Sequence, residues 1–155
     1  MQLRIANPKL AFAVESFTAK VVRDQFVYTV SGSEGLARVA SPTRKGREVT
    51  LVWSVRSEAE RWASSIAKQP RVNPITLANF LKDVLPKLQT FGRAVGTDWS
   101  AEPCEPEVEP FDLSRRLRQE INAAFIRGAV AGRHVYILED DHGPVFAAST
   151  ALPNQ

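Results

Sequence analysis

The chain has 155 residues, of which 44% are hydrophobic and 24% charged, and this composition excludes a wholly disordered protein. Its only cysteine, Cys104, excludes an intramolecular disulfide, and the longest uncharged runs are too short to span a membrane. The net charge of +3 is mild, and the start of the chain does not match a signal peptide, so we expect a cytoplasmic location.

The N-terminal part predicts a helix followed by three strands. Asn7 and Pro8 are typical of a helix start, in which asparagine caps and proline takes the first helical position. An apolar stripe at helical spacing follows: Leu10, Val14, Phe17 and Val21. The stretches FVYTVSGSEG, LARVAS and EVTLVW are rich in β-branched and apolar residues and are separated by turn residues. They predict an antiparallel meander over residues 26–53.

Two helices and another strand are expected next. Ser57 and Glu60 have the spacing of a capping box, so a helix should begin there and end before the next proline. The stretch NPITLANFLKDVLPKLQTFG, residues 73–92, predicts a second helix with a kink or early termination about Pro86. The stretch RAVGTDW, residues 93–99, is typical of a strand.

The last third of the chain predicts a loop, a helix and a hairpin. Prolines recur through residues 100–110, so this acidic stretch should be loop, and a helix should begin near Pro110. Residues 134–150 predict two strands about an Asp-Asp-His-Gly turn. The sequence therefore predicts one α+β domain over residues 1–155. In it, an antiparallel sheet is packed on one face by about four helices, with a C-terminal hairpin extension over about residues 128–150.

Five motifs, taken together, resemble a known family. FVYTVSGSEG, LVWSVRSEAERWA, NFLKDVLPKLQTFG, VGTDW and VEPFDLSRRL are similar in order and spacing to the small bacterial proteins grouped as domain of unknown function 2750. The resemblance covers about residues 10–121. Ser54 stands where the family often has proline, and the hairpin beyond Gly128 looks like an addition. The resemblance implies an α+β fold and brings no established activity, catalytic set or cofactor.

Several residues have both a structural and a chemical interpretation. Trp53 and Trp62 are interpreted as core packing ahead of an interface anchor, while Trp99 is either a lid over the core or a contact residue. The run EDDH at 139–142 is interpreted as a hairpin turn rather than a metal site, because consecutive side chains on a turn diverge. Cys104 lies among carboxylates that disfavour its thiolate. We therefore expect no catalytic residue, no metal, no cofactor and no enzymatic activity.

The acidic stretch is the predicted binding surface. It has five carboxylates and no lysine or arginine between Glu102 and Asp112, and its prolines lower the entropy lost on docking. The predicted partner-binding residues are Trp99, Glu102, Glu105, Glu107, Glu109, Asp112, Arg115 and Arg118. They predict a non-enzymatic protein-binding module. By analogy with other small α+β proteins, we expect an immunity protein that covers a bacterial toxin with a basic surface.

The alternative is a small nucleic-acid-associated or regulatory protein that uses the basic turn at residues 38–47. Its cations are Arg38, Arg44, Lys45 and Arg47. Aromatic residues that could stack on bases are missing among these charges, so nucleic acid is the weaker alternative. The oligomeric state stays open at this point.

Overall fold

The computed structural model describes residues 8–100, 106–130, 135–140 and 143–148. It confirms the α+β fold class, because helices and a several-stranded sheet are both present. The chain divides into two compact units, Met1–Arg116 and Leu117–Gln155. The expectation of one domain over residues 1–155 stays a prediction.

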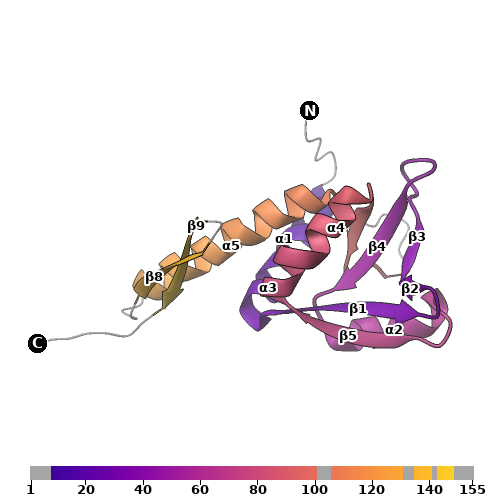
Figure 1. The fold of residues 1–155 in the computed structure, drawn as a ribbon, viewed down its shortest axis with the longest axis horizontal. Coiled ribbons are helices and arrows are strands. Elements are labelled where there is room, and N and C mark those ends of the chain that lie inside the picture. The colour runs from indigo at the N-terminus through magenta and orange to yellow at the C-terminus, as the bar shows by residue number, and fades with distance from the viewer. Residues whose placement is uncertain (1–7, 101–105, 131–134, 141–142, 149–155) are drawn as a thin grey trace, which may run out of the picture. The chain divides into compact units, whose positions relative to one another are not determined.

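Helices and strands are interspersed along the first unit (Figure 1). The helical segments are α1 (Pro8–Asp24), α2 (Arg56–Ile66), α3 (Leu77–Asn79), the π-helical turn η1 (Phe80–Val84) and α4 (Leu85–Thr90). The strands are β1 (Phe26–Gly32), β2 (Gly35–Leu36), β3 (Arg38–Ala40), β4 (Glu48–Trp53), β5 (Arg71–Thr76), β6 (Ala94–Thr97) and β7 (Glu107–Val108). Helix α5 (Pro110–Val130) begins in this unit and continues into the second.

The strands of the first unit form one mixed sheet. Across it β5 pairs with β1, β1 with β4, β4 with β6 and β6 with β7, while β2 pairs with β1 and β3 with β4. Every pair is antiparallel except β4 and β6, which are parallel, with Val49 opposite Ala94. The antiparallel meander is therefore right for residues 26–53 and wrong for the whole sheet. Residues 54–93 are long enough to return the chain to the edge where β4 began, as a parallel pair requires.

Strand β4 is buried on both faces, and helices cover both. Its residues from Val49 to Trp53 are all buried. On one face, Leu51 and Trp53 share a cluster with Ala59 and Ala63 of α2, and no described buried residue of α1 or α4 belongs to this cluster. The alternating residues of β4 point to the other face, and α1 and α4 contact the neighbouring strands. The prediction of helices on one face is wrong, and the continuous apolar run of β4 was the signal for two-sided burial.

Helix α2 begins without the predicted capping box. Its N-cap is Val55, which is extended and makes no side-chain capping bond. Ser57 lies inside the helix, and Glu60 accepts a hydrogen bond from Arg56 Nε at 3.1 Å instead of reaching back to the helix start. The entry to α2 is set by tertiary bonds at the end of β4, so the local pairing of serine and glutamate is not needed.

Residues 71–76 form a strand, where the sequence predicted the start of a helix. They pair with β1 over the whole of β5, with Pro74 opposite Tyr28. In the described sheet β5 has a neighbour on one side alone, and an edge strand tolerates a proline. The helix begins after Thr76, whose Oγ1 accepts a hydrogen bond from the Asn79 N–H at 3.2 Å. The helix predicted over residues 73–92 was therefore begun about one turn too early.

The irregularity expected about Pro86 is a π-helical turn. In η1 the Leu85 N–H donates to the Phe80 carbonyl, five residues earlier. Pro86 has no N–H to donate to the Lys82 carbonyl, so an α-helical pattern would leave that carbonyl unpaired. The helix then continues to Thr90, so the alternative of early termination is wrong.

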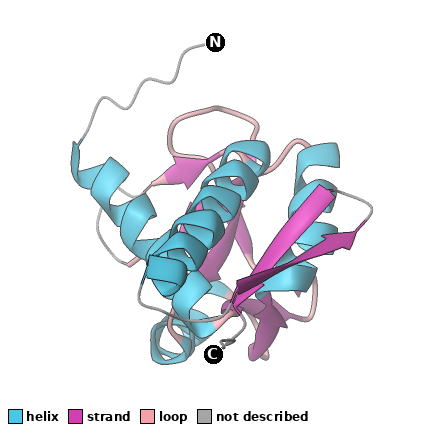
Figure 2. Ribbon diagram, turned by 90° about the vertical axis from the view of Figure 1, so that its left-hand side faces the viewer, coloured by secondary structure: helices cyan, strands magenta, loops and turns pink. Residues whose placement is uncertain are grey.

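The second unit contains the rest of α5 and a hairpin. Strands β8 (Val135–Asp140) and β9 (Gly143–Ala148) pair antiparallel along their whole length, and Figure 2 shows them side by side. The predicted hairpin is confirmed as a separate two-stranded sheet rather than an extension of the main sheet. Asp141 and His142 of its predicted turn lie outside the described residues. No helix in the described ranges has the length and apolar character needed to cross a membrane.

Candidate protein-binding surface

The carboxyl ends of the parallel strands β4 and β6 are joined by four residues, which we call the tryptophan clamp: Trp53, Ser54, Asp98 and Trp99. The Trp53 indole donates from Nε1 to the Trp99 carbonyl at 3.0 Å. The Ser54 N–H and hydroxyl donate to the two oxygens of Asp98, each at 2.7 Å. Trp53 is 1% exposed and lies among core residues. Its predicted role in packing therefore agrees with its position.

Asp98 has an unusual backbone and an unusual carboxyl group. Its φ of 53° is in the left-handed region, which aspartate tolerates better than most residues. Its N–H donates to the Val52 carbonyl at 2.9 Å, which continues the pairing beyond the end of β6. Burial raises the pKa of Asp98, and the bonds from Ser54 and the charge of Lys20 oppose this rise. The clamp is a closed set of bonds between two strand ends.

Trp99 acts as a lid over the core. A Cβ added at Gly96 would lie 2.7 Å from the Trp99 ring and 2.8 Å from the Leu51 side chain, so only glycine leaves room for the indole here. The ring packs against the core cluster, and its Nε1 donates to the Pro106 carbonyl at 2.6 Å. Of the two interpretations left open by the sequence, the geometry agrees with the lid.

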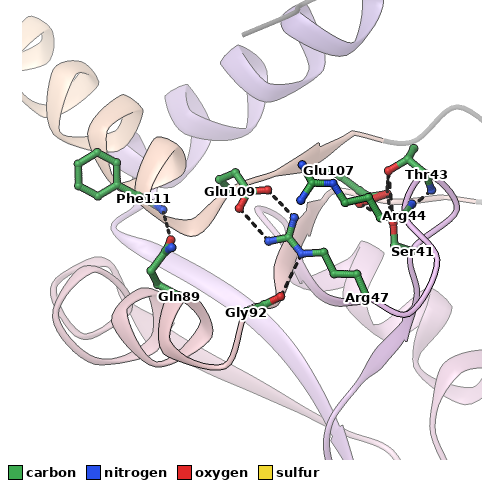
Figure 3. Close-up of polar contacts among 9 residues, drawn as sticks. All are labelled: Ser41, Thr43, Arg44, Arg47, Gln89, Gly92, Glu107, Glu109 and Phe111. Carbon is green, nitrogen blue, oxygen red and sulfur yellow. Dashed lines mark hydrogen bonds and ion pairs between the residues drawn. The ribbon is translucent and has the colours of Figure 1, made fainter. Parts of the chain in front are cut away.

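At the opposite end of β4, acidic and basic residues meet in what we call the charged junction: Ser41, Thr43, Arg47, Glu107 and Glu109. Arg47 donates to both oxygens of Glu109, from Nη1 at 2.5 Å and from Nη2 at 2.8 Å (Figure 3). Its Nε donates to the Gly92 carbonyl at 3.0 Å. The bond from Arg47 lowers the pKa of Glu109, while partial burial opposes the change.

Glu107 is held by the same turn. The Ser41 hydroxyl lies 2.8 and 2.9 Å from its two carboxylate oxygens, and the Thr43 hydroxyl donates at 3.0 Å. Glu107 belongs to β7, which pairs with β6, so the expectation of loop throughout residues 100–110 is wrong at this point. The turn between β3 and β4, predicted as a separate basic feature, is the internal partner of Glu107 and Glu109.

The other predicted site residues are distributed as follows. Asp112 accepts a hydrogen bond from Arg115 at 3.1 Å on the first turns of α5, and Arg118 is exposed further along that helix. Glu102, Glu105 and Cys104 lie outside the described residues. In the basic turn, Arg38 donates to Glu48 at 3.2 Å, while Arg44 and Lys45 are exposed. Of the predicted acidic residues that the structure describes, Glu107, Glu109 and Asp112 each accept hydrogen bonds from within the chain, and the predicted binding surface stays a prediction.

The structure shows a groove that the sequence did not predict. It lies between the helix formed by η1 and α4 and the start of α5, and we call it the α4–α5 groove. It is lined by Leu81, Leu85, Pro86, Gln89, Pro110, Phe111 and Ser114. Phe111 is 68% exposed, and its N–H donates to Gln89 Oε1 at 3.2 Å, which fixes the start of α5 beside α4 (Figure 3).

The signal for this groove was weak. Phe111 lies two residues before the buried Leu113, on a different side of the helix, so it falls outside the apolar stripe that predicted α5. Phe91 at the end of α4 is also exposed, at 66%, and lies 5.3 Å from the Arg93 guanidinium. An exposed aromatic residue off the main stripe was the available sign of this apolar surface.

Metal ligands do not gather in the described part of the chain: no group of three or more histidine, cysteine, aspartate or glutamate residues is placed to hold an ion.

The fold and the tryptophan clamp define a small α+β protein with a mixed sheet covered on both faces. The family model "Protein of unknown function (DUF2750)" matches residues 14–117, and the chain belongs to this family. The matched range contains the clamp and the groove, and it ends before the hairpin β8–β9. The resemblance stated from the sequence motifs is confirmed.

Comparisons with curated proteins and with solved structures add little to this family assignment. None of the curated proteins matches this chain. Among solved structures, Anabaena Tic22, described as a protein of protein transport, aligns with a TM-score of 0.36 and 12% sequence identity. The alignment covers 86% of this chain and 69% of the Anabaena chain.

Proposed function

We propose that this protein is a non-enzymatic module that binds another protein through the α4–α5 groove and the exposed Phe111 beside it. The exposure of Phe111 carries this proposal. A large aromatic side chain that is two-thirds exposed at the edge of an apolar groove gains free energy when a partner covers it. Aromatic side chains in such positions are frequent hot spots of protein interfaces.

Hydrogen bonds within the chain also hold the surface around Phe111 in place. Phe111 lies on the first turn of a long helix, and its backbone is bonded to Gln89. Glu109, which lies two residues before Phe111, accepts two hydrogen bonds from Arg47. A rigid surface loses less conformational entropy on association than a flexible one. The charged junction thus supports binding indirectly, by holding the groove open in one geometry.

The finer proposal is an immunity-type inhibitor. In this mechanism the protein covers the active or binding surface of a bacterial toxin and contributes no chemistry of its own. Glu107 and Glu109 of the acidic stretch already accept hydrogen bonds from Ser41 and Arg47. The proposed contact with the toxin is therefore the groove rather than the acidic stretch.

The test uses the product of the neighbouring reading frame as the partner. Co-expression should protect cells from that product, and the purified pair should form a complex measurable by calorimetry. Phe111→Asp should weaken the complex by about tenfold or more, since hot-spot losses are about 2 kcal/mol or larger. Phe12→Asp on α1 is the matched control, because Phe12 is 72% exposed and is not one of the residues that line the groove. Equal effects of the two variants, or no complex, would count against the proposal.

A further inference from the structure

In the first unit, several carboxylates form ion pairs within the chain, whereas two lysines beside the α4–α5 groove do not. Among the described residues, six carboxylates of the first unit form ion pairs within the chain: Asp24, Glu48, Glu58, Glu60, Glu109 and Asp112. Lys82 and Lys87, on either side of Pro86, are exposed and have no ion pair among the described residues. The exposed unpaired charge next to the groove is therefore mostly positive, with Asp83 as the opposing carboxylate.

Cations stand at both rims of the groove. Lys82 precedes Pro86 by four residues, so it lies next to that lining residue on the helix surface. Arg115 follows Phe111 by four residues on α5, and its side chain is 50% exposed. Asp112 accepts one hydrogen bond from Arg115 Nη2. A guanidinium has five N–H groups, so Arg115 retains donors for a second carboxylate.

The size of the groove favours side chains of a polypeptide over a whole small molecule. It has about 270 Å³ of space, at the lower limit of ligand pockets, and it is open to solvent. An amphipathic helix or extended segment can place one or two apolar side chains in such a groove while its polar residues meet the rims.

We propose that the α4–α5 groove binds an amphipathic segment of a partner protein that has leucine or phenylalanine on one side and carboxylates beside it. The inference rests on the proposed protein-binding function and adds the chemistry of the partner. The apolar side chains cover Phe111 and Pro86, and the carboxylates pair with Lys82 and Arg115. The partner segment is acidic, opposite in sign to the one predicted from the acidic stretch, because the exposed unpaired charges next to the groove are mostly positive, while Glu109 is ion-paired with Arg47 within the chain.

Three model peptides with the same leucine and phenylalanine stripe test this chemistry. Their polar positions are glutamate in the first, lysine in the second and glutamine in the third. Binding to the full chain is measured by fluorescence anisotropy at low and physiological salt. The acidic peptide should bind about tenfold or more tightly than the basic one, and the difference should shrink with salt.

Two variants locate the site. Lys82→Glu with Arg115→Glu should abolish or reverse the preference for the acidic peptide. Arg56→Glu with Arg61→Glu on α2 is the matched control, because it reverses two exposed charges away from the groove. Phe111→Asp should weaken all three peptides, and circular dichroism checks that each variant is folded.

The outcomes separate this inference from the proposed function. If the basic or neutral peptide binds as tightly as the acidic one, the acidic partner is wrong while the groove remains a protein-binding surface. If no peptide binds but Phe111→Asp still weakens the complex with the neighbouring gene product, the amphipathic segment is wrong and the proposed function stands. If Phe111→Asp changes neither, the proposed function itself fails.

Discussion

The two ends of β4 are tied to the same later part of the chain by different means. At its carboxyl end, the tryptophan clamp uses a buried indole, a hydroxyl and a partly buried carboxylate. At its amino end, the charged junction uses an arginine, with 14% of its side chain exposed, against a glutamate that is 42% exposed. The contacts at both ends of β4 hold the parallel strands β4 and β6 against the chain that follows β6.

The difference concerns how much each end contributes to stability. A buried tryptophan removes a large apolar area from water, and its loss leaves a cavity. An ion pair near the surface exchanges contacts with water for contacts within the protein and is screened by salt. We therefore expect the clamp to carry most of the stability and the charged junction to position the start of α5. The charged residues of this junction are then mainly structural.

The largest expected effect is that of Trp53→Ala. It removes a side chain that is 1% exposed, and it should lower the free energy of unfolding by about 3–5 kcal/mol. Chemical denaturation measures this loss. Trp62→Ala is the control, because Trp62 is only partly buried and its Nε1 has no partner in the described structure. Losses of the same size would show that the clamp is not the more important tryptophan site.

An intermediate effect is expected at the charged junction. Arg47→Ala and Glu109→Gln should each cost about 1–2 kcal/mol, because the bond between them is charged, paired at two atoms and partly buried. A double-mutant cycle should give a coupling of about 1 kcal/mol. The exposed pair Arg56 and Glu60 should give only about 0.3–0.5 kcal/mol in the same experiment. Equal couplings would remove the distinction between a positioning pair and an ordinary surface pair.

The smallest expected effect is a difference between the two ends of β4 in how their contribution to stability depends on pH. The pKa of Glu109 is lowered, so its contribution to stability is present above the unfolded-state pKa and is lost as the pH falls through the folded-state pKa. The pKa of Asp98 is raised, so stability falls as the pH rises from the unfolded-state pKa through the folded-state pKa.

Two variants measured at about pH 3 and about pH 7 test these signs. Glu109→Gln should cost more stability at the higher pH, and Asp98→Asn should cost more at the lower pH. Thermal unfolding of both variants and the unmodified protein provides the comparison. Parallel pH dependences would mean that one of the two carboxyl environments is wrongly assigned.

Local patterns in the sequence predicted the elements whose signals are local. The apolar stripe of α1, the β-branched runs of β1 and β4 and the hairpin β8–β9 were all found with the correct type. The error at 71–76 has a local cause, since an asparagine followed by proline is typical of a helix start. Pairing with β1 decided the conformation there, and this tertiary contact has no counterpart in the local pattern.

The site was harder to predict because its contacts are distant in sequence. Arg47 and Glu109 are 62 residues apart, and nothing in either segment indicates that they meet. The parallel pairing of β4 and β6 likewise depends on how the intervening chain returns. Phe111 could have been noticed as an aromatic residue outside the apolar stripe of its helix, whereas its contact with Gln89 required the fold.

The π-helical turn before Pro86 determines how deletions in this helix would affect the groove. A turn of this kind is equivalent to one residue inserted into an α-helix, with its extra length absorbed locally. Deleting one residue within Phe80–Val84 would be absorbed by the loss of the π-helical turn, whereas deleting Lys87 from α4 would rotate the residues after it by about 100°. Gln89 would keep its contact with Phe111 in the first case and lose it in the second. The position of a one-codon deletion therefore decides whether this helix still forms the wall of the groove.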